Sequence, residues 1–360
     1  MIAVDASWMV GQYRGMGAFA RALLEPVSNK VHALLPKRFP QAPYPTIRGG
    51  SGFFPWWEQV TLPRLCKEIG VKKLLCPYNT APIHLSTSVE LLLVVHDLIY
   101  MEPWKSLPPS VSPYQILGRV YRQFVVPRCI SRASKIVTVS EYMREQISTR
   151  FSVPKNILHV ISNSLNEEWF KDEPLSLDKR KPYLLAVSGE APNKNLQTLI
   201  RVFAAFRERL AHQACNITLR IVGIKPIYQK FFKRIAERYG VDKFVRFEPF
   251  LTESTLRNLY REAWLFVMPS LFEGFGIPAL EAMACGTPVA CSKSASLPEV
   301  VGNASWLFDP RDPNDMVRVL VAAWTDHRER FERSCIGLLR ATHFRRASVA
   351  ESIAKFWDVA

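Results

Sequence analysis

Two glutamates, Glu273 and Glu281, form a pair whose spacing suits the binding of a polyol. Glu273 opens a loop with two glycines, and Glu281 follows eight positions later in a run of strong helix formers. Eight residues are slightly more than two helical turns, so the two carboxylates can serve one cleft from different heights. Carboxylates make short, strong hydrogen bonds to hydroxyl groups. A surface helix with two solvated glutamates is the alternative, which the flanking glycines, prolines and strands disfavour.

The residues around this pair predict a strand, a glycine-rich loop, a short helix and a second strand. The apolar run 264–268 is typical of a buried parallel strand. Pro278 stands where the first turn of a helix tolerates proline, and Gly286 ends that helix. Residues 287–291 then begin the next strand. This order places backbone N–H groups and the positive end of a helix beside Glu273.

The stretch 270–288 resembles the donor-site signature of retaining glycosyltransferases of family 4, in which two glutamates separated by seven residues precede A-x-G-x-P-V. Residues 298–302 and 306–310 also look like that family. The resemblance implies an α/β protein of GT-B architecture, with two Rossmann-like domains facing across a cleft. It implies that Glu273 binds the hydroxyls of the donor sugar and Glu281 binds the ribose. The loop residues that it places at the donor are Gly274, Phe275, Gly276 and Ile277.

The first half of the chain continues this resemblance at two strand ends. The strand 1–5 leads into a loop like the one that lines the donor diphosphate in the family. This implies donor contacts from the backbone of Gly15, Met16 and Gly17, with Arg14 as a charge partner. The strand 91–95 ends at His96, in a V-H-D-L sequence. A lone histidine there is more often structural, but the family's histidine touches the donor sugar, so we predict a functional His96.

In the second half, the loop 188–195 matches the family's diphosphate loop with one departure. Lys194 stands in its expected place, whereas Asn193 occupies a position where arginine is common. One cation is therefore missing, and either Arg14 or backbone dipoles must replace it. Phe250 and Leu251 follow a predicted strand at the point where the family's backbone meets the nucleotide base.

The 360 residues predict about two domains of ordinary size. We expect an acceptor-binding domain over 1–168, a charged and irregular linker over 169–182, and a nucleotide-sugar-binding domain over 183–345. The resemblance implies that a last helix, 346–360, crosses back to the first domain.

The net charge of +15 would attract nucleic acid, anionic membranes and phosphorylated small molecules alike. The basic residues are dispersed and no nucleic-acid-binding motif accompanies them, so no nucleic-acid partner is expected. Residues 113–135 are basic and amphipathic, with a break or kink expected near Pro127. A core helix with a solvated arginine face and a helix lying on an anionic membrane both remain open for this segment.

The seven cysteines show no metal-ligand spacing and predict reduced thiols in the cytoplasm. No apolar run approaches the roughly 20 residues of a spanning helix, and the first residues show no signal-peptide pattern. We therefore expect a cytoplasmic protein, with the inner face of the membrane as its place if the basic helix contacts lipid.

The expected reaction is transfer of a hexosyl group, with mannose favoured, from a nucleotide diphosphate sugar to a saccharide or lipid-linked saccharide. No D-x-D sequence occurs, so no metal and no cofactor beyond the donor co-substrate are expected. Lys194 and backbone amides would stabilise the leaving diphosphate. The expected catalytic residues are Lys194, His96 and Glu273. Retention of configuration is implied by the family alone.

R-G-M-G, W-W-E-Q and V-H-D-L look most like bacterial mannosyltransferases of surface polysaccharide assembly, such as that of O-antigen. GDP-mannose is therefore the favoured donor and UDP-hexoses are its rivals. A GT-B epimerase or phosphorylase, a basic nucleic-acid-binding protein and an inactive membrane-associated scaffold are the alternatives.

Overall fold

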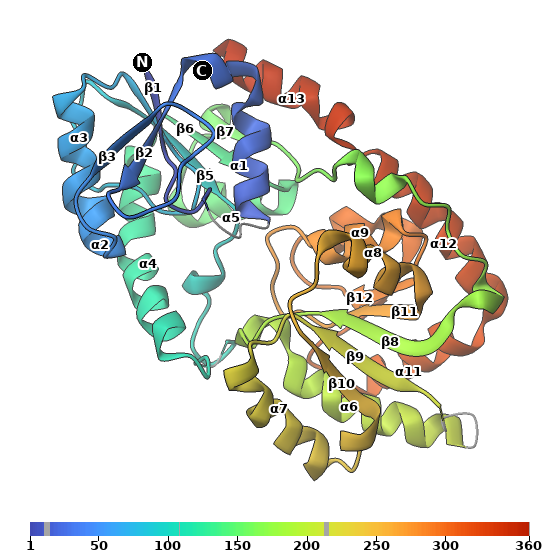
Figure 1. Ribbon diagram of the computed structural model, residues 1–360. Coiled ribbons are helices and arrows are strands. Elements are labelled where there is room, and N and C mark those ends of the chain that lie inside the picture. The colour runs from blue at the N-terminus through green and yellow to red at the C-terminus, as the bar shows by residue number, and fades with distance from the viewer. Residues whose placement is uncertain (11–14, 108, 212–215, 360) are drawn as a thin grey trace. The chain divides into compact units, whose positions relative to one another are not determined.

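The computed structural model describes residues 1–10, 15–107, 109–211 and 216–359 (Figure 1). The chain divides into two compact units, each built on one parallel sheet. The first unit comprises Met1–Met101, Leu117–Ser164 and Arg346–Ala360, and the second comprises Glu102–Ile116 and Leu165–Arg345. The predicted α/β class with parallel sheets is confirmed.

The first unit has a seven-stranded sheet in the order β3-β2-β1-β4-β5-β6-β7. Its strands are β1 (Ile2–Asp5), β2 (Val31–Pro36), β3 (Thr46–Gly49), β4 (Lys73–Cys76), β5 (Glu90–Val95), β6 (Lys135–Thr138) and β7 (Leu158–Val160). In β5 every residue after Glu90 is buried, which explains its unbroken apolar run. The sequence analysis did not identify β2 and β3, because His32, Pro36 and Arg48 interrupt their apolar pattern.

Six helices, three short 3₁₀ helices and a π-helical turn, Trp57–Thr61, accompany this sheet in the described part of the chain. The helices are α1 (Met16–Leu24), α2 (Phe54–Trp56), α3 (Leu62–Glu68), α4 (Pro113–Arg132), α5 (Glu141–Phe151) and α13 (Arg346–Val359). Of the break or kink expected near Pro127, the break is wrong, because α4 continues through that residue. Val125, Val126 and Cys129 are buried around Pro127, and this packing offsets the hydrogen bond that proline removes. Helix α13 packs on α1, where Nε1 of Trp357 donates to the carbonyl of Leu23 at 2.6 Å.

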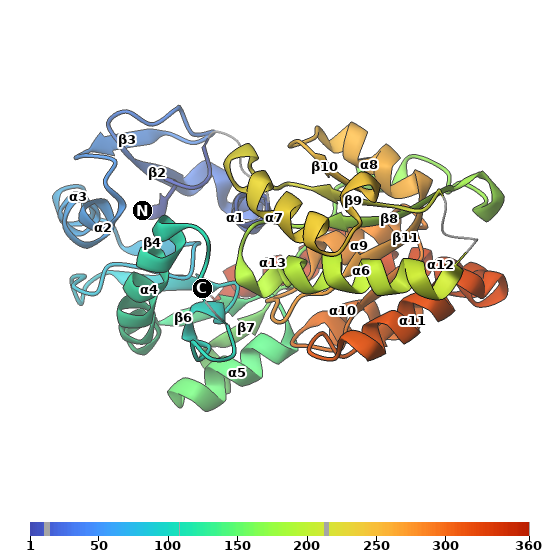
Figure 2. The same ribbon diagram turned by 90° about the horizontal axis from the view of Figure 1, so that it is seen from below.

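The second unit has a six-stranded sheet in the order β10-β9-β8-β11-β12-β13. Its strands are β8 (Lys181–Val187), β9 (Thr218–Val222), β10 (Val245–Glu248), β11 (Ala263–Met268), β12 (Val289–Ser292) and β13 (Ser305–Phe308). Its helices are α6 (Leu196–Leu210), α7 (Pro226–Arg238), α8 (Glu253–Glu262), α9 (Ile277–Ala284), α10 (Leu297–Val301), α11 (Pro313–Thr325) and α12 (His327–Thr342). Helices α6 and α11 lie side by side on one face of the sheet, and α8, α9 and α12 cover the other (Figures 1 and 2).

In each sheet the strand order reverses at one point. In the first unit β4 returns to the free side of β1, and in the second unit β11 returns to the free side of β8. The loops that leave two such neighbouring strands diverge toward opposite faces of the sheet, and this opening is where ligands bind in open α/β folds. Candidate site residues are therefore expected after β1 and β4 and after β8 and β11.

The units divide the chain differently from the expected domains in two places. Residues 102–116 group with the second unit, where Nε2 of Gln115 donates to Oε1 of Glu190 at 3.1 Å. Residues 165–168, expected in the first domain, and the expected linker 169–182 also belong to that unit. Leu165 forms a β-bridge with Arg345, and its N–H donates to the carbonyl of Phe344 at 2.9 Å.

Candidate functional site

Lys194 and Glu273 meet at the point of strand reversal in the second unit. Lys194 follows β8 in the 3₁₀ turn Pro192–Lys194, and Glu273 follows the neighbouring strand β11. Nζ of Lys194 lies 2.7 Å from Oε1 of Glu273. The lysine side chain is 26% exposed and the glutamate 12%, so both are largely buried but keep some contact with solvent. The structure thus brings together two residues that were predicted to act on the donor.

Asn193 holds these two loops together. Its carbonyl accepts from the N–H of Leu271 at 2.7 Å, and its Nδ2 donates to the carbonyl of Phe272 at 3.2 Å. Nδ2 of Asn195 adds a bond to the carbonyl of Pro269 at 3.2 Å. The residue that departs from the family pattern is therefore buried and fixes the backbone between Lys194 and Glu273.

The glycine-rich loop is locked in a conformation that only glycine accommodates at Gly276. This residue has a φ of 115°, and a Cβ there would lie 2.4 Å from Cδ2 of Leu297. Oγ of Ser296 donates to the carbonyls of Glu273 and Phe275, at 2.9 and 3.0 Å. Helix α9 begins at the next residue, Ile277, so its positive end lies at this loop. The predicted donor residues Gly274, Phe275, Gly276 and Ile277 form this turn and the start of the helix.

Glu281 lies on α9 and is held by a residue that the sequence analysis missed. The hydroxyl of Tyr260, on α8, donates to Oε2 of Glu281 at 2.8 Å. Tyr260 is fully buried, and the ring of Trp169 packs edge-on against it with centroids 5.9 Å apart. In the sequence, Tyr260 is one of the apolar positions of a helix, and nothing there indicates a hydrogen bond to Glu281. The contact becomes visible only in the folded structure.

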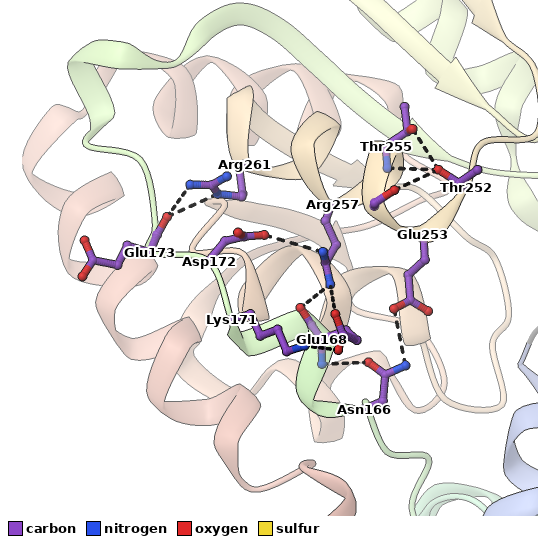
Figure 3. Close-up of polar contacts among 11 residues, drawn as sticks. Asn166, Glu168, Lys171, Asp172, Glu173, Thr252, Glu253, Thr255, Arg257 and Arg261 are labelled. Carbon is purple, nitrogen blue, oxygen red and sulfur yellow. Dashed lines mark hydrogen bonds and ion pairs between the residues drawn. The ribbon is translucent and has the colours of Figure 1, made fainter.

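Hydrogen bonds and ion pairs hold the segment Asn166–Glu173 against α8, the helix that carries Tyr260 (Figure 3). Arg257 pairs with Oε2 of Glu168 at 3.4 Å and with Oδ2 of Asp172 at 3.7 Å. Arg261 donates through Nη2 to the carbonyl of Glu173 at 2.8 Å. These contacts fix the segment that carries Trp169, and through Trp169 they support the ring of Tyr260.

Phe250 and Leu251 follow β10, which is an edge strand of the sheet and pairs with β9. Phe250 is 57% exposed, and Leu251 is half-buried. Both residues follow the carboxyl end of their strand, as Lys194 and Glu273 do. Their predicted contact with a nucleotide base stays a prediction.

In the first unit, His96 directly follows β5 and is 6% exposed. Its N–H donates to Oδ1 of Asn79 at 2.6 Å, and its Nε2 lies 2.9 Å from the carbonyl of Pro77. A carbonyl only accepts, so Nε2 carries the proton. Burial lowers the pKa of His96 to about 4, which keeps the ring neutral near pH 7 with Nδ1 as an acceptor.

The start of α1 also lies beside His96, because the ring of Phe19 packs edge-on at 5.1 Å between centroids. Gly15 is the residue before α1 and has a φ of 56°, and Met16 is 38% exposed while Gly17 is buried. The structure therefore places the predicted loop residues 15–17 at a helix N-terminus. Arg14 lies outside the described residues.

No group of three or more His, Cys, Asp or Glu side chains within the described ranges could hold a metal ion. None of the helices in the described part of the chain combines the length and apolar character needed to cross a bilayer.

The chain is similar in sequence to known transferases. Residues 167–334 match the family model described as "Glycosyl transferases group 1". The serotype-specific mannosyltransferase WbdA of Escherichia coli is 29% identical over 267 residues, which cover 69% of this chain and 32% of WbdA. O-antigen chain mannosyltransferase B of Escherichia coli is 29% identical over 232 residues, which cover 62% of this chain and 60% of that protein. The chain thus spans less than two thirds of the length of either relative.

Solved structures share the fold at low sequence identity. WaaG, a glycosyltransferase involved in lipopolysaccharide biosynthesis, superposes with a TM-score of 0.76 at 16% identity, over 99% of each chain. Anabaena HepE, solved in complex with UDP and glucose, has a TM-score of 0.72 at 16% identity, over 100% of this chain and 99% of its own. These similarities confirm the predicted GT-B fold.

Proposed function

Since residues 167–334 are a domain of the glycosyl transferases group 1 family, we propose that this protein transfers a hexosyl group from a nucleotide diphosphate sugar to a saccharide acceptor. The observation that carries this proposal is the pair of Lys194 and Glu273 at the strand reversal, beside the N-terminus of α9. A cation and a helix end suit a leaving diphosphate, and a carboxylate suits sugar hydroxyls.

Each side chain has a definite task in this proposal. Lys194 and the N-terminal end of α9 stabilise the charge that develops on the departing diphosphate. Glu273 accepts hydrogen bonds from sugar hydroxyls, and Glu281 accepts them from the ribose. Neutral His96 accepts a hydroxyl hydrogen bond at Nδ1, and the loop 15–17 offers backbone N–H groups to the phosphates.

We propose GDP-mannose as the donor and a saccharide or lipid-linked saccharide as the acceptor. The names of WbdA and O-antigen chain mannosyltransferase B support mannose and a place in surface polysaccharide assembly. UDP-hexoses remain the rival donors, since HepE was solved with UDP and glucose.

Retention without a metal is the proposed course of the reaction. The bond from the anomeric carbon to the phosphate oxygen breaks, and the acceptor oxygen attacks the same face. The acceptor proton passes to the leaving phosphate oxygen, which balances the step. The absence of D-x-D from the sequence and the cation at position 194 support a reaction that needs no metal.

The cytoplasm is the proposed place of this reaction. All cysteines that the structure describes are free thiols, which suits a reducing compartment. They are Cys66, Cys76, Cys129, Cys285, Cys291 and Cys335.

The test is turnover of radiolabelled GDP-mannose and UDP-glucose with EDTA present, with and without a panel of mannose-terminated acceptors. Formation of GDP and a labelled glycoside, lost in Glu273→Gln, supports the proposal. Product NMR reads the anomeric configuration, and an inverted product overturns the retaining course. Interconversion of the sugar without transfer would indicate an epimerase, and phosphate-dependent cleavage of a glycoside would indicate a phosphorylase.

A further inference from the structure

A second ion pair lies at the edge of the sheet that carries Lys194 and Glu273. Nζ of Lys225 lies 3.5 Å from Oε1 of Glu190. Lys225 follows β9, and Glu190 belongs to the loop 188–195 that follows the neighbouring strand β8. This loop therefore contributes one member to each of two ion pairs, Glu190 to the first and Lys194 to the second.

Backbone contacts, and not the ion pair alone, hold the loops after β8 and β9 together. The N–H of Ser188 donates to the carbonyl of Val222 at 2.9 Å. Gly223 has a φ of 101°, and a Cβ there would lie 2.6 Å from the carbonyl oxygen of Ser188. Lys225 follows this glycine closely, as the residue before α7. Its place beside the loop after β8 is therefore fixed by its own backbone.

The two partners of this second ion pair differ in exposure. The side chain of Glu190 is 6% exposed and also accepts from Nε2 of Gln115 at 3.1 Å, whereas the side chain of Lys225 is 59% exposed. The 3.5 Å contact of Lys225 is longer than the 2.7 Å contact between Lys194 and Glu273. An ammonium group has three N–H donors, so Lys225 can keep its contact with the buried carboxylate and still donate to a second anion. A buried acid thus holds an accessible cation at this edge of the sheet.

The loop 188–195 has one cation fewer than the family pattern, because Asn193 stands where arginine is common. Asn193 is buried and bonded to the loop that carries Glu273, so it offers a phosphate no charge. Arg14 was one expected replacement and lies outside the described residues. Lys225 brings a positive charge to the same loop from the neighbouring strand.

The order of the strands puts Lys225 between two predicted donor contacts. Phe250 follows β10, Lys225 follows β9, Lys194 follows β8 and Glu273 follows β11, and these four strands are neighbours in that order. The parts of a nucleoside diphosphate sugar follow one another as base, ribose, diphosphate and sugar. This inference rests on the function proposed above: we propose that Lys225 is a further donor-binding residue, which contacts the diphosphate from the β9 side of the loop 188–195.

Calorimetric titration of the full chain with GDP and with UDP, with EDTA present, tests this placement. Lys225→Met should weaken binding of whichever nucleotide the wild-type protein binds by at least about tenfold, because a hydrogen bond between two charged groups is lost. Lys225→Arg should keep most of the affinity, since the cation remains. The matched control is Lys233→Met, which removes the same charge from an exposed position about two turns further along α7. This control should change the affinity by less than about twofold.

Lys194→Met separates failure of this placement from failure of the proposed function. Unchanged affinity in Lys225→Met, together with a loss in Lys194→Met, would overturn the role of Lys225 and leave the proposed function standing. Equal loss in Lys225→Met and Lys233→Met would assign the effect to net charge and would also overturn that role. No binding of either nucleotide by the wild-type protein would overturn both proposals.

Melting temperatures distinguish a binding role from a purely structural ion pair. If the pair with Glu190 only stabilised the fold, Lys225→Met would lower the melting temperature and leave the affinity for the nucleotide unchanged. If Lys225→Met and Lys225→Arg lost affinity equally and melted earlier by the same amount, the loss would come from the fold and the placement would fall. The expected result is a loss of affinity in Lys225→Met alone, with both variants folded.

Discussion

Nζ of Lys194 lies 2.7 Å from Oε1 of Glu273, and this contact joins loops that follow two adjacent strands, β8 and β11. In the proposed reaction, a donor phosphate that enters the site would compete with Glu273 for the same ammonium group. The glutamate would then be released toward the sugar hydroxyls, which would couple donor binding to the alignment of Glu273.

Replacement of Lys194 by methionine should lower kcat of transfer by about a hundredfold or more, because the charge on the leaving diphosphate loses its cation. The free energy of unfolding should also fall, because the 12%-exposed carboxylate of Glu273 loses its cation. Steady-state transfer rates and melting temperatures check this. Lys181→Met is the control, because Lys181 makes a 2.7 Å ion pair with Glu262 at the other end of β8. Equal loss of rate in both variants would contradict the assignment of Lys194.

Replacement of Tyr260 by phenylalanine should weaken binding of the nucleoside diphosphate by about threefold to tenfold. The change removes the hydrogen bond that orients Glu281, worth about 0.5–1.5 kcal/mol, and keeps the buried ring. Calorimetric titration measures the dissociation constant, and KM should rise more than kcat falls. Tyr183→Phe is the matched control, since that buried hydroxyl donates to the carbonyl of Leu259 at 2.6 Å and not to Glu281. An unchanged affinity for the nucleoside diphosphate in Tyr260→Phe would show that Tyr260 does not orient Glu281 for binding.

His96→Gln should flatten the dependence of stability on pH below neutrality. The lowered pKa of His96, about 4 against 6.5, means that the unfolded state binds more protons between these values. Wild-type stability therefore falls as pH drops from about 6.5 toward 4, and by pH 5 this amounts to about 2 kcal/mol. Urea unfolding at pH 5 and 7.5 should show a smaller difference in the variant. The exposed His84 provides the control, His84→Gln, and the same flattening there would contradict the burial of His96.

Glu58→Gln should stabilise the protein more at pH 8 than at pH 5. Burial raises the pKa of Glu58 from 4.5 to about 7, so the folded state binds more protons between these values. Wild-type stability is thus greatest at low pH and falls as pH rises toward 7. The gain of the variant should grow by about 2 kcal/mol between pH 5 and 8. Urea unfolding measures it, and Glu90→Gln at the half-exposed partner of Lys73 is the control. A gain in stability that does not change with pH would contradict the raised pKa of Glu58.

The elements that position the site could be predicted because each buries a regular pattern. Helix α6, Leu196–Leu210, can be predicted from the sequence because its apolar residues recur on one face. The buried run of β5 predicted both the strand and the place of His96 at its end. The strand β3 escaped prediction because its four residues include Arg48 and only its last residue is buried.

The contacts within the site could not be predicted, because they join residues far apart in the chain. Lys194 and Glu273 are 79 positions apart, and their pairing depends on β11 lying beside β8. Ser296 and Tyr260 belong to no motif, and the hydrogen bonds that they donate exist only once α8, α9 and the loop before α10 have packed. A resemblance could assign roles to some of these residues, but it carried no information about Ser296 and Tyr260.

The central claim is that the second unit binds a nucleoside diphosphate sugar at Lys194, and thermal stabilisation tests it most directly. Melting temperatures would be recorded with GDP, UDP, ADP, CDP and dTDP and their sugar forms, with EDTA present. A ligand at about 100 times its dissociation constant adds roughly 2.7 kcal/mol of stability, which is visible as a melting shift. We expect GDP and GDP-mannose to raise the melting temperature of the wild-type protein and to have little effect on Lys194→Met. A shift in melting temperature with UDP or dTDP instead would show that the donor carries that nucleotide and not GDP. No shift with any nucleotide would contradict nucleotide-sugar binding at Lys194.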